Sequence, residues 1–128
     1  YPFKLHGYVD YYTVDTEAKT VTICDLKTSG KTVDKFTESV DFYNYWLQAA
    51  IYSKMVYDSL GDDKNEYTIT FKFIVIDKYN QVYVYDVSKV SMANYAEGLE
   101  GVLNRVAHHY NTRDYSLPYE LLVNKVKL

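Results

Sequence analysis

The sequence predicts one α/β (α+β) domain in which a central mixed β-sheet is flanked by helices. Segments rich in β-branched and aromatic residues alternate with segments whose apolar residues recur every three or four positions. Their order along the chain is strand, strand, helix, strand, strand, helix, which is typical of a layered sheet-and-helix architecture. A chain of 128 residues, 48% of them hydrophobic, is long enough to form one core, so we expect a single domain over residues 1–128.

The first two predicted strands cover residues 5–14 and 20–28, with a turn between them. Side chains alternate between the two faces of a strand. One face of the second strand therefore carries, in order, Val21, Ile23, Asp25 and Lys27. Its apolar beginning is expected in the core, and its polar end at the rim of the sheet, where an ion can reach it.

A helix is predicted to follow a short segment, residues 32–40, that is either helical or irregular. Asp41 or Asn44 caps the main helix, which runs to about Leu60 and is ended by Gly61. An apolar stripe is expected along it at Leu47, Ile51 and Met55. Gln48 and Tyr52 are four residues apart and share the neighbouring face.

The second half of the chain predicts a hairpin and a long helix. Residues 66–76 and 81–87 form the two strands, and Ser91 caps a helix that runs to about Tyr110. Pro118 can open a last short helix. The 16 tyrosines fall mostly on predicted strands and helices, so we expect most of them, and Trp46, to be packing residues.

Composition limits the classes of protein. No apolar run approaches the about 20 residues of a membrane span, and the start of the chain lacks the features of a signal peptide. A single cysteine excludes an internal disulfide. These features predict a cytoplasmic protein without membrane contact. The net charge of −3 argues mildly against nucleic acid as a partner, although a bound cation offsets acidic residues at a metal site.

Two acidic residues and a lysine are the candidate chemical groups. Asp25 and Lys27 lie side by side on one face at the end of a strand, and Asp10 on the preceding strand can converge on Asp25. Carboxylates of this kind hold a divalent metal, which positions a water for phosphodiester hydrolysis. Gln48 both donates and accepts hydrogen bonds, so it can tether Lys27 or a water.

Three motifs in this order resemble the PD-(D/E)XK nuclease superfamily, in particular its RecB-like and phage-type exonuclease branch. The matching segments are Gly7 with Asp10, then Asp25-Leu26-Lys27-Thr28, then residues 45–52 with Gln48 and Tyr52. The resemblance covers the first half of the chain closely and the second half only in its architecture. It implies a restriction-endonuclease-like core.

The resemblance also implies roles for individual residues. Asp10 and Asp25 would be metal ligands for Mg²⁺ or Mn²⁺, with the backbone carbonyl of Leu26 as a third ligand. Lys27 would orient or deprotonate the attacking water. Gln48 and Tyr52 would steady the site or touch the DNA backbone.

The implied function is that of a metal-dependent deoxyribonuclease, expected to be an exonuclease of phage or prophage recombination or repair type. Related phage exonucleases form rings around DNA, so a homo-oligomer is compatible with the resemblance. This branch often carries a further ligand on a helix before the first strand, whereas the given sequence begins on that strand. The helix is therefore either absent or outside the given sequence, which can be a fragment of a longer protein. The alternative is a catalytically degenerate nuclease-fold domain that binds DNA or a protein.

Overall fold

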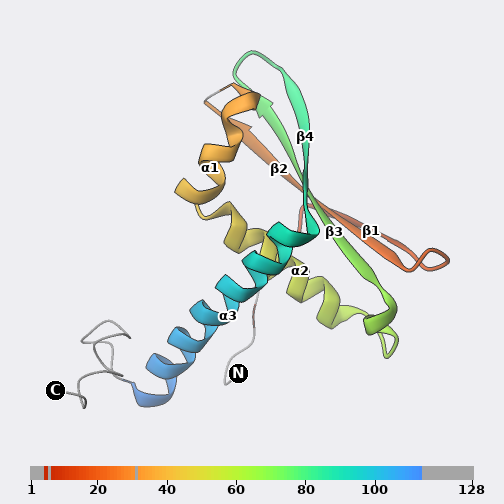
Figure 1. Cartoon of the computed structure of the whole chain (residues 1–128), viewed down its shortest axis with the longest axis vertical. Helices are drawn as coiled ribbons and strands as arrows, with labels where there is room; N and C mark the ends of the chain where they lie inside the picture. Colours follow the sequence, from red (N-terminus) through yellow and green to blue (C-terminus); the bar gives the residue numbers. More distant parts are fainter. Residues whose placement is uncertain (1–4, 6, 31, 114–128) are drawn as a thin grey trace.

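The computed structural model describes residues 5, 7–30 and 32–113, and these form four strands and three α-helices (Figure 1). The strands are β1 (Tyr11–Asp15), β2 (Thr20–Ser29), β3 (Thr68–Asp77) and β4 (Val82–Val87). The α-helices are α1 (Phe36–Phe42), α2 (Tyr45–Ser59) and α3 (Lys89–Thr112). Short 3₁₀ turns occupy Val33–Lys35 and Lys64–Glu66.

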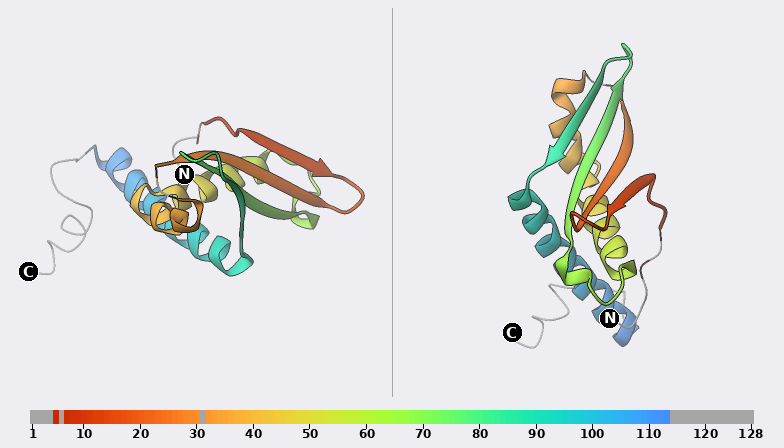
Figure 2. Two further views of the ribbon diagram at one scale, coloured as in Figure 1. Left: turned by 90° about the horizontal axis from the view of Figure 1, so that it is seen from above. Right: turned by 90° about the vertical axis from the view of Figure 1, so that its right-hand side faces the viewer.

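The four strands form one mixed sheet in the order β1-β2-β3-β4. β1 and β2 are an antiparallel hairpin, as are β3 and β4, whereas β2 and β3 are parallel. The parallel pair arises because the chain crosses over through α1 and α2 before it returns to the sheet. The predicted α+β class with a mixed sheet and flanking helices is therefore confirmed (Figure 2).

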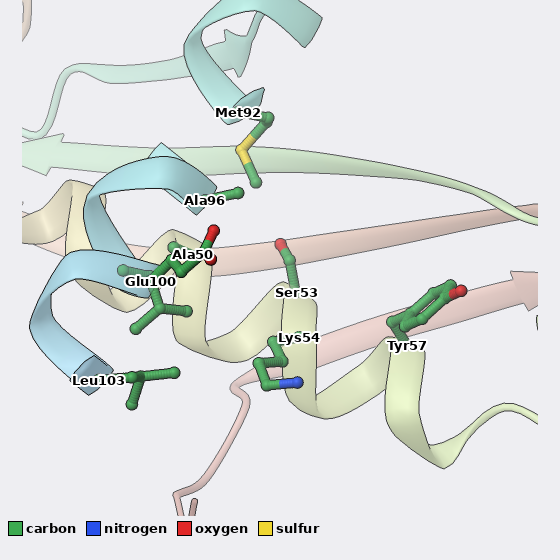
Figure 3. Close-up of a pocket in the computed structure, with 9 residues that line it drawn as sticks. Ala50, Ser53, Lys54, Tyr57, Met92, Ala96, Glu100 and Leu103 are labelled. Atoms are coloured by element: carbon green, nitrogen blue, oxygen red, sulfur yellow. The ribbon is translucent and has the colours of Figure 1, made fainter. Parts of the chain in front are cut away.

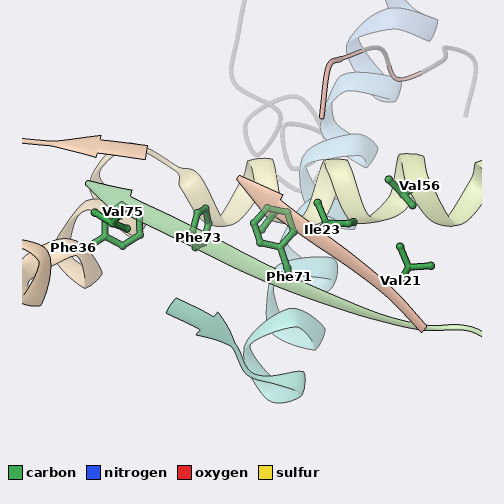
Figure 4. Packing of buried hydrophobic residues seen from close by; sticks show 8 residues of the cluster. Val21, Ile23, Phe36, Val56, Phe71, Phe73 and Val75 are labelled. Atoms are coloured by element: carbon green, nitrogen blue, oxygen red, sulfur yellow. The ribbon is translucent and has the colours of Figure 1, made fainter. Parts of the chain in front are cut away.

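The main core lies between the sheet and the helices (Figure 4). Alternate residues of the two central strands meet residues of α1 and α2, and all are nearly inaccessible to solvent. They are Val21, Ile23, Phe71, Phe73 and Val75 from the sheet, and Phe36, Ala49 and Val56 from the helices. The alternating residues on the other face, such as Leu26 and Val84, are exposed, so the helices cover one face of the sheet.

A second buried cluster joins α2 to α3. Ala50 of α2 packs with Leu99 and Leu103 of α3, and the predicted stripe residues Leu47 and Ile51 pack at its edge. The fully buried residues that α2 contributes to the main core, Ala49 and Val56, have small side chains, which let the helix lie close to the sheet.

Trp46 packs against α3, as predicted for a packing residue. A Cβ atom at Gly98 would lie 2.7 Å from the Trp46 ring, closer than side chains tolerate. Glycine at position 98 is therefore what lets the indole lie against the α3 backbone.

The predicted strand over residues 5–14 is wrong in its first half. β1 begins only at Tyr11, and Gly7 to Val9 have no regular structure, so Asp10 lies at a bend just before the strand rather than on it. The backbone N–H of Leu26, which would pair with a longer β1, donates instead to the Asp10 carboxylate. A side-chain acceptor has replaced the backbone ladder at this point.

The helix ends also differ from the prediction. The N-cap of α3 is Ser88, whose hydroxyl accepts the Ser91 N–H at 3.1 Å, so Ser91 is the donor and not the cap. Asn44 is the N-cap of α2, but through a left-handed backbone (φ 56°) and not through a side-chain hydrogen bond. α2 ends at Ser59, one residue before its extended C-cap Leu60.

The predicted last helix at Pro118 lies outside the described residues. Within the part of the chain that the structure describes, no helix combines the length and the apolar character needed to cross a bilayer.

Candidate functional site

The polar end of β2 lies on the same face of the sheet as the core. Asp25 is 4% exposed, and the Lys27 Nζ atom lies 2.9 Å from its Oδ2 atom as an ion pair. Although the ion pair is close, Oδ2 accepts no well-directed hydrogen bond from the described residues. The Lys27 ammonium is therefore the charged partner of this buried carboxylate oxygen.

Asp10 joins this pair from the bend before β1. Its Oδ2 atom accepts the Leu26 N–H at 2.9 Å, and its carboxyl group lies within hydrogen-bonding reach of the Asp25 carboxyl group. Asp10 is exposed whereas Asp25 is buried, so the two carboxyl groups together lead from solvent into the site. The structure thus brings the two predicted acidic residues together.

Lys27 is held on several sides. Besides Asp25, its ammonium donates to the Gln48 side-chain carbonyl of α2 and lies 4.3 Å from the centre of the Tyr45 ring. An ammonium over the face of an aromatic ring is attracted by the ring quadrupole. The N-terminal turn of α2 therefore positions the lysine, and the predicted tether from Gln48 is present.

The two carboxyl groups differ in their pKa. Burial raises the pKa of Asp25, with the nearby Asp10 adding to the rise and Lys27 opposing it. The hydrogen bond from the Leu26 amide lowers the pKa of Asp10, and its contact with Asp25 acts in the same direction. When the pair shares one proton, that proton therefore resides on Asp25.

The backbone of Leu26 adds a third oxygen. The N–H and C=O of one strand residue point to the same side, so the Leu26 carbonyl projects toward the edge where its N–H meets Asp10. Two carboxylates and one carbonyl match the oxygen ligands of Mg²⁺, which retains several waters. The donor set fits this ion, although no group of three or more His, Cys, Asp or Glu residues gathers within the described ranges.

Tyr52 lies away from these groups. One turn beyond Gln48 on α2, it packs at the edge of the main core, and its ring lies beside Gly7, three residues before Asp10. The structure thus places Tyr52 under the segment that leads to Asp10, and places Asp10, Asp25, Lys27 and Gln48 in one cluster.

Tyr45 was not predicted as a site residue, although it contacts Lys27 directly. The signal that points to it is spacing, because Tyr45 precedes Gln48 by three residues and therefore shares its helix face. In a chain with 16 tyrosines, the residue type alone carries little information.

A separate cavity of about 400 Å³ lies between α2 and α3 (Figure 3). Its α2 side includes Ala50, Ser53 and Tyr57, on the side of the helix roughly opposite Gln48. The Ser53 hydroxyl is buried there without a hydrogen-bond partner among the described residues. This cavity is distinct from the carboxylate site.

Comparison of the chain with protein-family models and with curated protein sequences gave no match. The functional inference therefore depends on the chemistry of the site itself.

Proposed function

We propose that the protein is a metal-dependent deoxyribonuclease of the PD-(D/E)XK type, with a restriction-endonuclease-like core. The observation that carries the proposal is the cluster of Asp10, Asp25 and Lys27 at the edge of the sheet. Ionised Asp25 is unfavourable in the metal-free site, because burial and the neighbouring Asp10 both oppose its ionisation and Lys27 offsets them only in part. A bound divalent ion removes this conflict.

Asp10, Asp25 and the carbonyl of Leu26 would hold Mg²⁺ or Mn²⁺. When bound, such an ion lowers the pKa of water and stabilises negative charge on a phosphate. Lys27 would orient the attacking water and donate hydrogen bonds to the phosphate oxygens. Gln48 and Tyr45 hold its flexible side chain in one place, which reduces the entropy lost on reaching the reactive arrangement.

The decisive experiment measures hydrolysis of linear DNA with Mg²⁺ or Mn²⁺. Asp25→Asn and Lys27→Ala should each abolish cleavage, while circular dichroism shows that the fold is intact. Asp58→Asn is the matched control, because Asp58 is an exposed acidic residue that pairs with Lys54 on the outside of α2. Full cleavage by either site variant would rule out the assigned roles.

The second candidate function is that of a degenerate nuclease-fold domain that binds DNA or a protein. It is favoured by the ion pair between Lys27 and Asp25, which already neutralises part of the charge that a metal would balance. Calorimetric titration with Mn²⁺ separates the two. Metal binding that depends on Asp10 and Asp25, together with DNA hydrolysis, supports the nuclease, whereas an absence of metal binding supports the binding module.

A further inference from the structure

Four aromatic rings form a row that runs from the core to the surface at the junction of α1 and α2. Phe36 stacks on Tyr45 with 5.7 Å between ring centres, and Tyr45 stacks on Tyr43 at 5.4 Å. Tyr43 meets Phe42 edge to face at 4.8 Å. The exposed fraction rises along the row from 1% at Phe36 to 58% at Tyr43 and 78% at Phe42.

The junction itself displays the two outer rings. α1 ends at Phe42 and α2 begins at Tyr45, and between them Asn44 adopts the left-handed conformation (φ 56°). Asparagine tolerates this conformation better than most residues. Adjacent, highly exposed Phe and Tyr side chains leave apolar area in water, which is a feature of binding surfaces.

The aromatic row is directly connected to the candidate site. The Tyr45 ring that stacks on Tyr43 is also the ring beneath the Lys27 ammonium, 4.3 Å from its centre. A ligand that stacks on Tyr43 or Phe42 therefore lies near the lysine that we assign to the phosphate.

A cavity beside the row supplies polar groups. It has a volume of about 200 Å³ and is lined by Tyr43 and Tyr45, by the end of β2 and by α1. The polar residues that line it are Thr28, Ser29 and Ser39. Pockets for drug-sized ligands have volumes of about 300–1,000 Å³, so this cavity fits a smaller group, such as one ring with polar edges.

We propose that the exposed rings of Phe42 and Tyr43, with this cavity, bind an unpaired nucleobase next to the phosphate that Lys27 contacts. Nucleobases are flat, stack on aromatic side chains, and carry hydrogen-bonding edges that the polar lining residues can meet. A base inside a duplex is already stacked and paired, so the surface selects single-stranded DNA or a frayed end. This inference rests on the proposed nuclease function, because it takes DNA as the ligand.

The charges nearby favour stacking over binding by the phosphate backbone. Asp41 of α1 is acidic and exposed, and it would repel a phosphate chain that followed this surface. Binding through the rings should therefore depend only weakly on salt concentration.

The test measures binding of a short single-stranded oligonucleotide that carries 2-aminopurine, whose fluorescence is quenched on stacking. Chelator in the buffer prevents hydrolysis, so binding is read independently of cleavage. The double variant Phe42→Ala with Tyr43→Ala should bind about 5- to 100-fold more weakly, from the typical range for loss of a stacked base. Phe42→Trp should retain the quenching, whereas Phe42→Leu, which is apolar but cannot stack, should reduce it.

Tyr110→Ala is the matched control, because Tyr110 is a surface aromatic residue near the far end of α3. It should bind as the unaltered protein does. Equal binding by the double alanine variant, no binding of the single strand by the unaltered protein, or equal loss of single-stranded and blunt duplex binding would each overturn the inference.

The two proposals fail in distinguishable ways. If DNA cleavage is unaffected by the loss of Phe42 and Tyr43, the proposed stacking surface is wrong but the proposed nuclease activity stands. If stacking is observed but no metal-dependent cleavage is found, the proposed nuclease activity is wrong but the surface that binds single strands stands.

Discussion

One face of β2 is turned toward α2, and the side chains in the first and second halves of that face have different roles. Val21 and Ile23 are fully buried against the core. Two and four residues after Ile23, Asp25 and Lys27 occupy equivalent positions and are also largely buried, but they form an ion pair. The first half stabilises the fold, and the second half places charge where burial makes it unfavourable.

This difference shows that burial alone does not separate structural from functional residues. Asp77 at the end of β3 is as buried as Asp25, but its carboxylate accepts hydrogen bonds from the Tyr79 and Gln81 amides of the following turn. Asp25 instead faces a lysine and a second carboxyl group. The charged groups that surround Asp25, and not its depth, mark the site.

The largest effect is expected from the apolar half and its partner strand. Phe71 is buried between β2 and the helices, so Phe71→Ala should lower the free energy of unfolding by about 3–5 kcal/mol, the usual cost of truncating a core aromatic residue. Urea denaturation measures this change. Phe42→Ala, at a 78% exposed position, should change the free energy of unfolding by less than about 0.5 kcal/mol.

Replacing Asp25 and Lys27 by apolar residues should remove the difference between the two halves of β2. The double variant Asp25→Val with Lys27→Met replaces a buried ion pair by apolar groups and should raise the free energy of unfolding by about 1–4 kcal/mol, the range seen for such replacements. Cleavage should be lost in the same protein. Asp25→Val alone should destabilise the fold, because it leaves the Lys27 ammonium without its carboxylate; stabilisation by this single change would contradict the assignment.

A smaller effect is expected when only the position of Lys27 is disturbed. Gln48→Leu removes the acceptor from α2 and should reduce cleavage by about 10- to 100-fold, as for groups that orient active-site residues. Gln48→Glu keeps an acceptor and should retain more activity than the leucine variant. An unchanged melting temperature of the leucine variant would separate misplacement of Lys27 from damage to the fold.

The smallest effect concerns pH. The pKa of Asp25 is raised from its ordinary value of 3.8, so the folded protein retains a proton that the unfolded chain releases. As the pH rises above 3.8 through the raised pKa, Asp25 should therefore lower the stability of the metal-free protein. Asp25→Asn should show an increasing advantage over this range in thermal melts, and Mn²⁺ affinity of the unaltered protein should increase with pH over the same range.

Much of this site was predictable because it depends on regular spacing. The alternation along residues 20–28 correctly placed Val21 and Ile23 in the core, whereas Asp25, which was expected at an ion-accessible rim of the sheet, is itself only 4% exposed. Helical spacing likewise brought Gln48 to the sheet side of α2. Such periodic placement follows from the geometry of strands and helices alone.

Other features escaped prediction because they depend on competition between side chain and backbone. Residues 5–14 are predicted as one strand, yet the Asp10 carboxylate accepts the amide N–H of Leu26 and β1 starts only at Tyr11. Ser88 and Ser91 are equally suitable caps by residue type, and only the hydrogen bond between them decides. Spacing puts Tyr45 on the helix face of Gln48, but its contact with Lys27 depends on a strand distant in the sequence.

Leu26 shows how one residue can serve two independent surfaces. Its backbone amide anchors Asp10, while its side chain, on a residue that is 52% exposed, lies on the uncovered face of the sheet. Substitutions of the Leu26 side chain could therefore change that exposed face without affecting the candidate site. Proline is the exception, because it has no amide hydrogen with which to fix the neighbouring acid.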